Sequence, residues 1–430
     1  MTDRGRVLIA LTSLPLLLAA CVTAGRREAD RSDVEIMGPW RDSEADRFAE
    51  VLAPFESVSG IDVRYVGSGD FVSDLRQRAS EGADPPDIAV IPQLGLVDEL
   101  IAQELVLPLD DDVRREVLEN FGVDETTAAE EGGVHAIPFR STVKSLVWFR
   151  PELFDEHDWQ IPETLEELEA LVDTIQDDTD LAPWCFSIEA GSATGWAATD
   201  WIEDLVLHAA GAEVYQDWVD GEVRFADDEI ADAFGRFHDL VLAPGRTAGG
   251  TRAIIERPVD EAWEPLLAPE PGCALYKQAD FATGWMPAGL EIGPDDDIYF
   301  FAMPSEDADD ALAVAGGDQI VQFDSNEDID EVMAYLAGSS APSIWARQGG
   351  FIAANPQVPD DVYPERYRVA LTDVLAGSEV LVDASDWMPP DVGADLFWEQ
   401  ITSWIAGSVD YATLAETLDE AMDVARESLE

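Results

Sequence analysis

The order of strand-like and helix-like segments near the start of the chain most limits what it can fold into. Residues 34–37 are apolar and β-prone, and residues 61–66 alternate apolar and polar side chains as a half-buried strand does. Between them, apolar side chains at helical spacing predict a helix that opens at Ser43. A helix around Leu75 and a short apolar strand at residues 88–91 follow. This β, α, β, α, β order predicts a parallel sheet covered by helices.

Similar segments continue along the chain. Residues 134–139 and 145–149 are expected to be extended, and residues 162–164 open a helix with one apolar face. The last third is expected to be mainly helical, with helices at about 326–337, 364–376, 395–406 and 411–427. A chain of 430 residues is expected to divide into two or three domains or lobes.

The charge of the chain restricts its partners. It has 25 basic and 90 acidic side chains, a formal net charge of −65. Nucleic acid needs a basic surface, so this charge excludes a nucleic-acid partner. The hydrophobic residues, 47% of the total, still suffice for ordinary cores. Because Lys144 and Lys277 are the only lysines, the composition indicates a surface adapted to high salt, which screens self-repulsion.

The first twenty residues are typical of an export signal. Arg4 and Arg6 precede an apolar run at residues 7–18, which is too short to cross a membrane as a helix. The run ends in Leu18-Ala19-Ala20-Cys21, which is similar to a bacterial lipobox. We therefore expect a signal peptide at residues 1–20, a lipid on Cys21, a tether at residues 21–32 and attachment to the outer face of the cell membrane. A chance cysteine at the end of a signal is the alternative.

Export also affects the interpretation of the other two cysteines. Outside the cytoplasm, a pair such as Cys185 and Cys273 forms a disulfide more often than a redox site. Two buried free thiols are the alternative. The four histidines are scattered along the sequence, so neither cysteine is expected to be catalytic.

The motifs of common cofactor and metal sites are incomplete. Gly67-Ser68-Gly69 lacks the third glycine of a dinucleotide fingerprint, because Val72 occupies that position. No zinc helix, nucleophile elbow or Walker loop occurs in the sequence. We expect no catalytic residues, no metal and no cofactor.

Four segments in order resemble motifs of the family 1 extracellular solute-binding proteins of ABC importers, and the likeness covers nearly all of residues 33–427. The segments include Pro85-Pro86-Asp87-Ile88, Leu105-Val106-Leu107-Pro108-Leu109-Asp110, Val134-His135-Ala136-Ile137-Pro138-Phe139 with Lys144-Ser145-Leu146-Val147-Trp148-Phe149, and Pro162-Glu163-Thr164-Leu165-Glu166-Glu167-Leu168. A narrower likeness is to the α-glucoside binders, through Pro183-Trp184-Cys185, the segment 195–204, Gly272-Cys273 and Ser385-Asp386-Trp387-Met388-Pro389.

The resemblance implies a two-lobed α/β fold of the type II periplasmic-binding-protein kind, with the ligand cleft between the lobes. It implies a first lobe at residues 33–143 plus 300–352 and a second at 144–299 plus 353–430. Chain crossings are expected near 140–147, 297–302 and 350–356.

The resemblance also implies a function. A monomeric lipoprotein that is not an enzyme would capture an oligosaccharide, α-glucoside or maltodextrin-like, and deliver it to the permease subunits of an ABC importer. Two alternatives remain open: a binder of a non-sugar solute such as a polyamine, and a surface-anchored carbohydrate-active enzyme.

A sugar site needs aromatic platforms and a few fixed polar groups. The candidate platforms are Trp40, Trp196, Phe281, Trp285 and Trp398, of which Phe281 and Trp398 correspond to stacking tryptophans in maltose-binding relatives. Trp196 and Trp285 are expected in loops, and Trp201 and Trp404 in the core. The polar candidates are Arg41, Glu44, Gly67, Ser68, Asp70, Gln93, Arg140, Lys144, Glu189, Asp200, Gln278, Asp318 and Asp386. Asp318 follows Gly316-Gly317, and such glycines allow backbone to approach a ligand closely. For each tryptophan a packing role, and for each acid a solvated surface, is the alternative.

Overall fold

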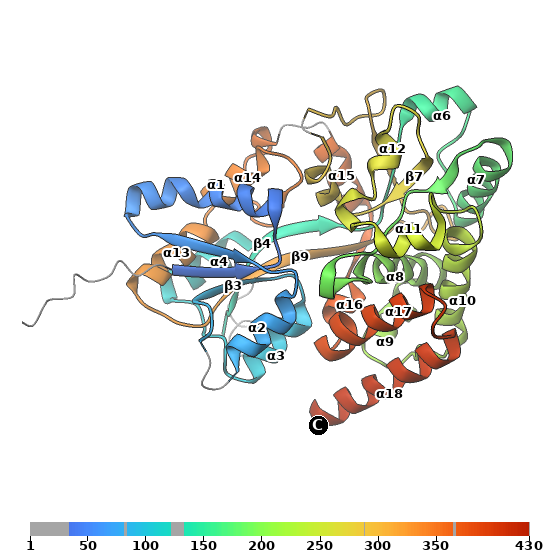
Figure 1. Ribbon diagram of the computed structural model, residues 1–430. Helices are drawn as coiled ribbons and strands as arrows, with labels where there is room; N and C mark the ends of the chain where they lie inside the picture. The colour runs from blue at the N-terminus through green and yellow to red at the C-terminus, as the bar shows by residue number, and fades with distance from the viewer. Residues whose placement is uncertain (1–33, 81–83, 122–132, 288, 364–366, 430) are drawn as a thin grey trace, which may run out of the picture.

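The computed structural model describes residues 34–80, 84–121, 133–287, 289–363 and 367–429. The expected signal peptide at 1–20, the tether at 21–32 and Cys21 lie outside the described residues. The described chain forms two α/β lobes side by side, joined by long strands that run from one lobe into the other (Figure 1).

Sheet A organises the first lobe. Its spatial order is β10–β4–β9–β3–β1–β2, with β11 also paired to β9, which makes seven strands among the described residues. The pairs β1–β2 and β1–β3 are parallel, as the β, α, β, α, β order predicts. The bounds are β1 (Val34–Gly38), β2 (Val63–Gly67), β3 (Ile88–Ile91), β4 (Ala136–Val143), β9 (Leu312–Gln322), β10 (Ile352–Ala353) and β11 (Glu379–Val382).

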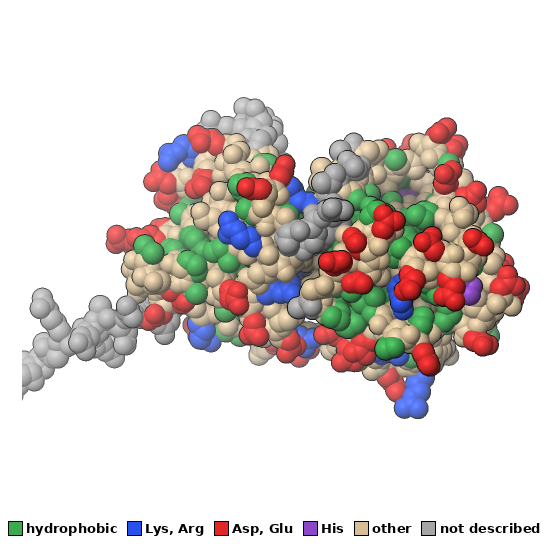
Figure 2. Space-filling model, turned by 90° about the horizontal axis from the view of Figure 1, so that it is seen from above, with side chains coloured by type: hydrophobic (Ala, Val, Ile, Leu, Met, Phe, Trp, Pro, Cys, Tyr) green, Lys and Arg blue, Asp and Glu red, His purple; other side chains and the backbone are tan. Residues whose placement is uncertain are grey.

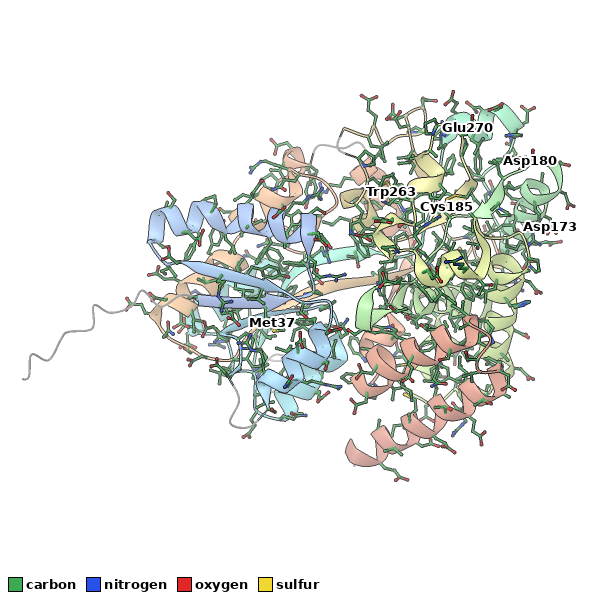
Figure 3. The ribbon with its side chains drawn as sticks, viewed as in Figure 1. Met37, Asp173, Asp180, Cys185, Trp263 and Glu270 are labelled. Carbon is green, nitrogen blue, oxygen red and sulfur yellow. A yellow bond between two sulfur atoms is a disulfide. The ribbon has the colours of Figure 1, made fainter. Side chains whose placement is uncertain are left out.

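Helices cover both faces of sheet A with separate apolar cores. One core packs α1 (Asp42–Ser59), α4 (Asp111–Phe121), α13 (Glu327–Ala337) and α14 (Ser340–Ala346) against one face. The other packs α2 (Phe71–Ala79) and α3 (Leu94–Ala102) against the opposite face. Met37 belongs to this second core, and Figure 3 labels it in the first lobe.

Sheet B belongs to the second lobe, which is richer in helices. The described strands have the order β6–β7–β5–β8, with bounds β5 (Leu146–Phe149), β6 (Ala182–Trp184), β7 (Cys273–Lys277) and β8 (Tyr299–Ala302). The α-helices are α6 (Pro151–His157), α7 (Leu165–Asp178), α8 (Trp196–Ala210), α9 (Ala212–Val219), α10 (Asp228–Phe237), α11 (Gly250–Glu256), α12 (Glu264–Leu267), α15 (Tyr367–Gly377), α16 (Ala384–Trp387), α17 (Trp398–Ile405) and α18 (Tyr411–Leu429). Short helical turns include η1 (Gly191–Ala193), η4 (Asp280–Gly284) and η6 (Asp391–Phe397).

Several expected elements are confirmed with small shifts at their ends. Helix α1 begins at Asp42, so Ser43 lies within its first turn and does not cap it. Thr164 caps α7 by accepting a hydrogen bond from the N–H of Glu167. The expected core residue Trp201 is buried, and Trp404 packs against the same core.

The chain passes between the sheets where β4 is followed by β5, at residues 144–145, within the crossing expected near 140–147. The return passage follows β8, because Tyr299–Ala302 pairs with β5 in sheet B. The boundary expected at residue 300 falls inside this strand, and the crossing expected near 297–302 overlaps it. Met303, Glu306 and Val314 still pack on second-lobe elements, so the chain enters the first lobe within β9. The third passage leaves β10, which pairs with β4, and continues toward α15.

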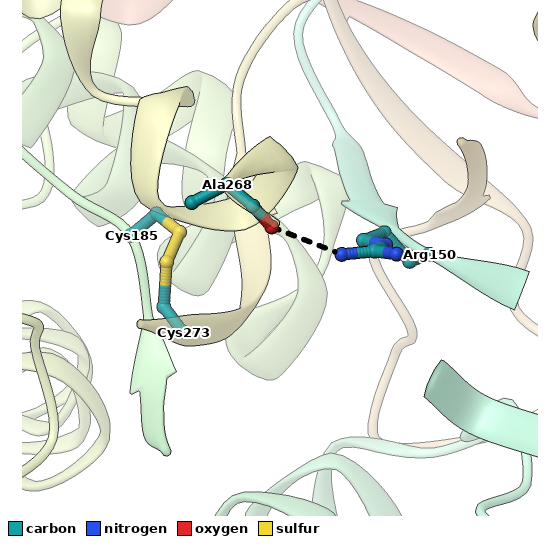
Figure 4. Close-up of a disulfide and its surroundings, with 4 residues drawn as sticks. All are labelled: Arg150, Cys185, Ala268 and Cys273. Atoms are coloured by element: carbon teal, nitrogen blue, oxygen red, sulfur yellow. Dashed lines mark hydrogen bonds between the residues drawn. A yellow bond between two sulfur atoms is a disulfide. The ribbon is translucent and has the colours of Figure 1, made fainter. Parts of the chain in front are cut away.

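A disulfide joins Cys185 to Cys273 with their Cα atoms 5.5 Å apart, as predicted for an exported chain. Figure 4 shows it beside the segment that carries Ala268, whose carbonyl accepts a hydrogen bond from Arg150 at 3.3 Å. The bridge fastens the segment after β6 to the start of β7, and these two strands are parallel neighbours. Both sulfurs are buried in the core under sheet B.

Acidic side chains cover both lobes in the face shown in Figure 2, with few basic ones between them. This distribution fits the low pI of about 4.1. Among the described residues, no helix combines the length and apolar character that a bilayer crossing requires.

Candidate functional site: an interlobe cavity

A cavity of about 300 Å³ lies between the two lobes. The first lobe lines it with residues that follow the carboxyl ends of β1, β2 and β3. In open α/β sheets these ends are the usual place for a ligand, because loops leave the strands there. The second lobe contributes η1, the start of α8, η4, α16 and α17.

Three half-buried aromatic rings form one wall in the second lobe. Trp196 and Phe281 have ring centroids 6.0 Å apart, and Phe281 meets Trp285 edge-on at 5.1 Å. Trp40 and Trp398 also line the cavity but are only 1% and 6% exposed. The wall at Phe281 therefore offers more ring surface to a ligand than Trp40, which packs among Phe48, Tyr65, Phe139 and Trp345.

A buried arginine lines the cavity. Arg140 on β4 forms an ion pair with Asp318 on β9 and another with Glu44 at 2.9 Å. Its guanidinium lies 5.4 Å from the ring centroids of both Trp40 and Phe281. Burial disfavours its charge, but Asp318 and Glu44 hold the pKa of Arg140 above its ordinary value. Burial raises the pKa of Asp318, and Arg140 opposes this rise.

A second buried charge cluster lies where the chain crosses between the sheets. The ammonium of Lys144 contacts Asp383, Asp200 at 3.1 Å and Asp386 at 3.6 Å. Glu203 accepts hydrogen bonds from the N–H groups of Ala384 and Ser385. Burial raises the pKa of Glu203 and Asp386 well above their ordinary values and that of Asp200 to about 6.

Carboxylate oxygens of Asp200, Glu203 and Asp383 lie within 4.8 Å of one another, a spacing that a metal ion could bridge. The ammonium of Lys144 already contacts two of these three carboxylates. It supplies the positive charge that a metal would otherwise bring, so the cluster is explained as a buried ion network.

The lobes touch each other around the cavity. On one side Arg76 of α2 contacts Asp391 at 2.6 Å and Asp395 at 2.9 Å in η6. Ser192 of η1 donates a hydrogen bond to the carbonyl of Gly69 at 2.8 Å. Elsewhere Arg47 of α1 donates to the carbonyl of Gly284 in η4 at 3.0 Å. These contacts hold the two lobes against each other beside the cavity.

The structure brings most of the candidate residues together. The lining includes Trp40, Arg41, Glu44, Ser68, Gln93, Arg140, Lys144, Glu189, Trp196, Asp200, Phe281, Trp285, Asp318, Asp386 and Trp398. Asp70, Gly67 and Gln278 are not among the lining residues. Asp70 is exposed just before α2, and the side-chain oxygen of Gln278 accepts a hydrogen bond from the N–H of Ala279.

The structure refines two local expectations. Gly317 lines the cavity and also allows a close approach of two strands, because a Cβ there would lie 2.3 Å from the carbonyl oxygen of Arg140. It lies in the β4–β9 pairing, beside an irregularity in register at Pro138 and Arg140. Trp196 is the first residue of α8, where Gly195 with φ 118° precedes it, and does not lie in a loop.

Other lining residues carried no signal in the sequence that we could use. They include Asp42, Ser192, Pro258, Asp260 and Asp395. Glu189 and Pro258 are brought side by side by an isolated parallel bridge. Such a pairing between distant segments leaves no local pattern.

Two α/β lobes, three chain passages between them and a cavity lined from both lobes define the two-lobed class of solute-binding proteins. Residues 41–338 match the family described as bacterial extracellular solute-binding protein. The chain belongs to this family.

Two relatives match almost the whole chain. The chain is similar to the osmoprotective compounds-binding protein GgtB of Synechocystis sp., with 31% identity over 400 residues, 91% of this chain and 93% of GgtB. It is also similar to the alpha-glucosides-binding periplasmic protein AglE of Rhizobium meliloti, with 31% identity over 402 residues. This alignment covers 90% of this chain and 86% of AglE.

A solved chitin oligosaccharide binding protein has the same fold. It superimposes with a TM-score of 0.75 at 15% identity, covering 92% of this chain and 100% of that protein. This likeness supports the two-lobed architecture expected from the sequence.

Proposed function

We propose that this protein captures an oligosaccharide, α-glucoside or maltodextrin-like, between its lobes and delivers it to the permease subunits of an ABC importer. The observation that carries the proposal is the cavity between the lobes, where half-buried rings of one lobe lie close to a buried arginine and carboxylates of the other. Aromatic rings pack on the apolar C–H faces of a sugar, and carboxylates accept hydrogen bonds from its hydroxyl groups.

Delivery to a permease depends on two arrangements of the lobes. A ligand that contacts both lobes favours the closed arrangement, because those contacts exist only when the cavity is closed. A relative that is named for binding α-glucosides supports a saccharide ligand. A monomer is sufficient for such a motion, because one chain supplies both lobes.

Thermal shift in high salt tests the function. Maltose, trehalose, sucrose and maltodextrins are expected to raise the melting temperature, because a ligand bound to the folded state stabilises it by mass action. Chromatography of the mixture is expected to return the sugar unchanged. Release of glucose at a useful turnover would support a carbohydrate-active enzyme instead.

The acidic cavity makes a polyamine the second candidate. Spermidine and putrescine belong in the same screen. A shift with spermidine and none with any saccharide would replace the sugar proposal.

The proposed location at the outer face of the membrane depends on Cys21. We expect Cys21→Ala, expressed in a bacterial host, to move the protein from the membrane fraction to the soluble fraction, because the lipid would be lost. Retention in the membrane fraction would contradict the lipid anchor and leave the sugar proposal standing.

A further inference from the structure

We propose that the cavity selects its ligand by charge: it accepts uncharged or amine-bearing glycosides and rejects those that carry a carboxylate, phosphate or sulfate. The inference rests on the proposed function and specifies the chemical class of ligand for the same cavity.

The cationic side chains at the cavity are largely committed to protein partners. Arg140 is paired with Asp318 and Glu44, and Lys144 with three aspartates. Neither cation has a charge left for an anionic ligand. The third cationic lining residue, Arg41, is exposed, and its guanidinium lies against Gly69.

Carboxylates outnumber these cations. The lining contains eight acids, Asp42, Glu44, Glu189, Asp200, Asp260, Asp318, Asp386 and Asp395. Against the three lining cations and Arg76, which pairs with Asp395, they leave a formal excess of four negative charges. If both of the buried acids Asp200 and Asp386 were protonated, two negative charges would remain, so the sign of the field does not depend on them.

Four lining residues that are exposed or half-buried, Arg41, Asp42, Glu189 and Asp260, form what we call the mouth of the cavity. Acidic side chains also outnumber basic ones there. Asp42 and Arg41 come from the first lobe, and Glu189 and Asp260 from the second. Burial raises the pKa of Asp260, and the negative charge of Asp42 on the other lobe adds to this rise. The four side chains are therefore close enough to interact, and three of them are acidic. A single arginine among three carboxylates does not create a binding site for an anion.

The expected discrimination follows from Coulomb's law. An anionic group about 6 Å from one uncompensated carboxylate loses about 3-fold in affinity if the contact is fully hydrated and about 100-fold at an effective dielectric constant of about 20. A cationic group at the same place gains by a similar factor. Exposed charges at the mouth are screened by salt more than buried ones.

Matched ligands test the proposal by calorimetry. The probes are maltose and trehalose, each as the native sugar, as the derivative with one C6 carbon oxidised to a carboxylate, and as the derivative with one C6 hydroxyl replaced by an amine. The amine is expected to bind as tightly as the native sugar or tighter, and the carboxylate about 10-fold weaker or more at about 0.1 M salt. The differences are expected to shrink as salt is raised.

A variant with fewer acids at the mouth provides the second arm. Glu189→Gln with Asp260→Asn keeps the side-chain oxygen of Glu189 that accepts from the N–H of Gly191. This pair of changes is expected to reduce the discrimination against the carboxylate several-fold. Glu213→Gln with Asp217→Asn, two exposed acids of α9 outside the cavity, makes the same change in net charge and is expected to have no effect.

The outcomes separate this inference from the function on which it rests. Carboxylate derivatives that bind as tightly as the native sugars would overturn charge selection and leave sugar binding intact. Equal discrimination in the Glu189/Asp260 variant and in wild type would overturn the role of the mouth. If none of the six probes and no maltodextrin binds, the proposed function itself fails, and this inference fails with it.

Discussion

Phe281 is the residue whose role in binding is most directly testable. Its ring is half-buried between Trp196 and Trp285 and faces the guanidinium of Arg140. Phe281→Ala is expected to remove about 1 to 3 kcal/mol of sugar affinity, about 5- to 150-fold, because a ligand loses an apolar stacking surface. Isothermal titration calorimetry measures this loss.

Phe281→Trp is the matched control, because it keeps an aromatic face at the same position. It is expected to bind sugar within a few-fold of wild type. Normal affinity of Phe281→Ala, in a protein that binds sugar tightly, would show that this ring is not a platform.

Substitutions of Trp398 and Asp318 test sugar binding less directly, because both residues also stabilise the folded protein. Trp398 is largely buried, so Trp398→Ala also leaves a cavity in the protein core. Asp318 holds the buried charge of Arg140, so its removal is expected to cost stability as well as affinity. For both variants the melting temperature has to be measured beside the affinity.

Asp280 links protonation to stability at the junction of the lobes. It accepts a hydrogen bond from the N–H of Val143 at 2.7 Å, and burial raises its pKa to about 7. The unfolded chain has an Asp pKa of about 4, so the folded state holds this proton more tightly. The stability from this group is therefore fully present below about pH 4 and is lost as the pH rises through about 7.

Asp280→Asn removes the titrating group and keeps an oxygen that can accept from Val143. We expect its melting temperature to fall less than that of wild type between about pH 5 and pH 8. Burial also raises the pKa of Asp200 to about 6, but both proteins contain Asp200, so its contribution cancels in the comparison. Parallel melting curves for the two proteins would show that Asp280 is already ionised in the folded state.

At the scale of elements, the contact between α2 and η6 joins the lobes beside the cavity. Arg76 contributes the positive charge and Asp391 and Asp395 the negative charges. Arg76→Gln is expected to weaken sugar binding by about 2- to 5-fold, mainly through faster dissociation, because a partly exposed ion pair contributes about 0.5 to 1 kcal/mol. Stopped-flow dissociation rates at low and high salt measure the effect.

Arg115→Gln is a suitable control for this prediction. Arg115 pairs with Asp112 within α4 and does not bridge the lobes. It carries the same change of charge and is expected to leave dissociation unchanged. Equal rates for the Arg76 variant, the control and wild type would contradict a role of this contact in holding the lobes closed.

The elements themselves could be predicted well where apolar periodicity was strong. The first three strands, α7 and α13 follow from patterns of a few residues, and Asn326 caps α13 with its side-chain oxygen. The boundary expected at residue 300 cuts through strand β8, because the pairing of this strand with β5 depends on a partner about 150 residues earlier.

The cavity could be predicted only in part, because many of its residues are brought together by contacts between segments that are distant in the sequence. Residues that follow the parallel strands β1, β2 and β3 were accessible to sequence reasoning, because strand order fixes where those strands end. Asp260 and Asp395 were not, since their positions depend on how the helices and turns of the second lobe pack. The long-range ion pairs of Arg140 and Lys144 likewise exist only once both sheets have formed.

At the scale of the whole molecule, the net charge of −65 is expected to make stability depend on salt. Repulsion among exposed carboxylates destabilises the compact state and is screened as the ionic strength rises. We expect the melting temperature to rise between about 0.1 and 2 M NaCl. A melting temperature that is flat or falls over this range would contradict an adaptation to salt.

The relative motion of the lobes can be measured in solution. Contacts around the cavity connect the two lobes, so we expect sugar to enter through a more open arrangement. Small-angle scattering is expected to give a larger radius of gyration without sugar than with it. An identical radius with and without a tightly bound sugar would mean that entry does not require lobe opening.

The position of β9 affects when this protein can fold during its synthesis. β9 lies between β4 and β3, so sheet A remains in two separate halves until residue 322 has been made. By then most of the second lobe has also left the ribosome, yet it lacks α16, α17 and α18. Neither lobe can finish folding on a partly made chain. We therefore expect the nascent polypeptide to complete both lobes only late in its synthesis.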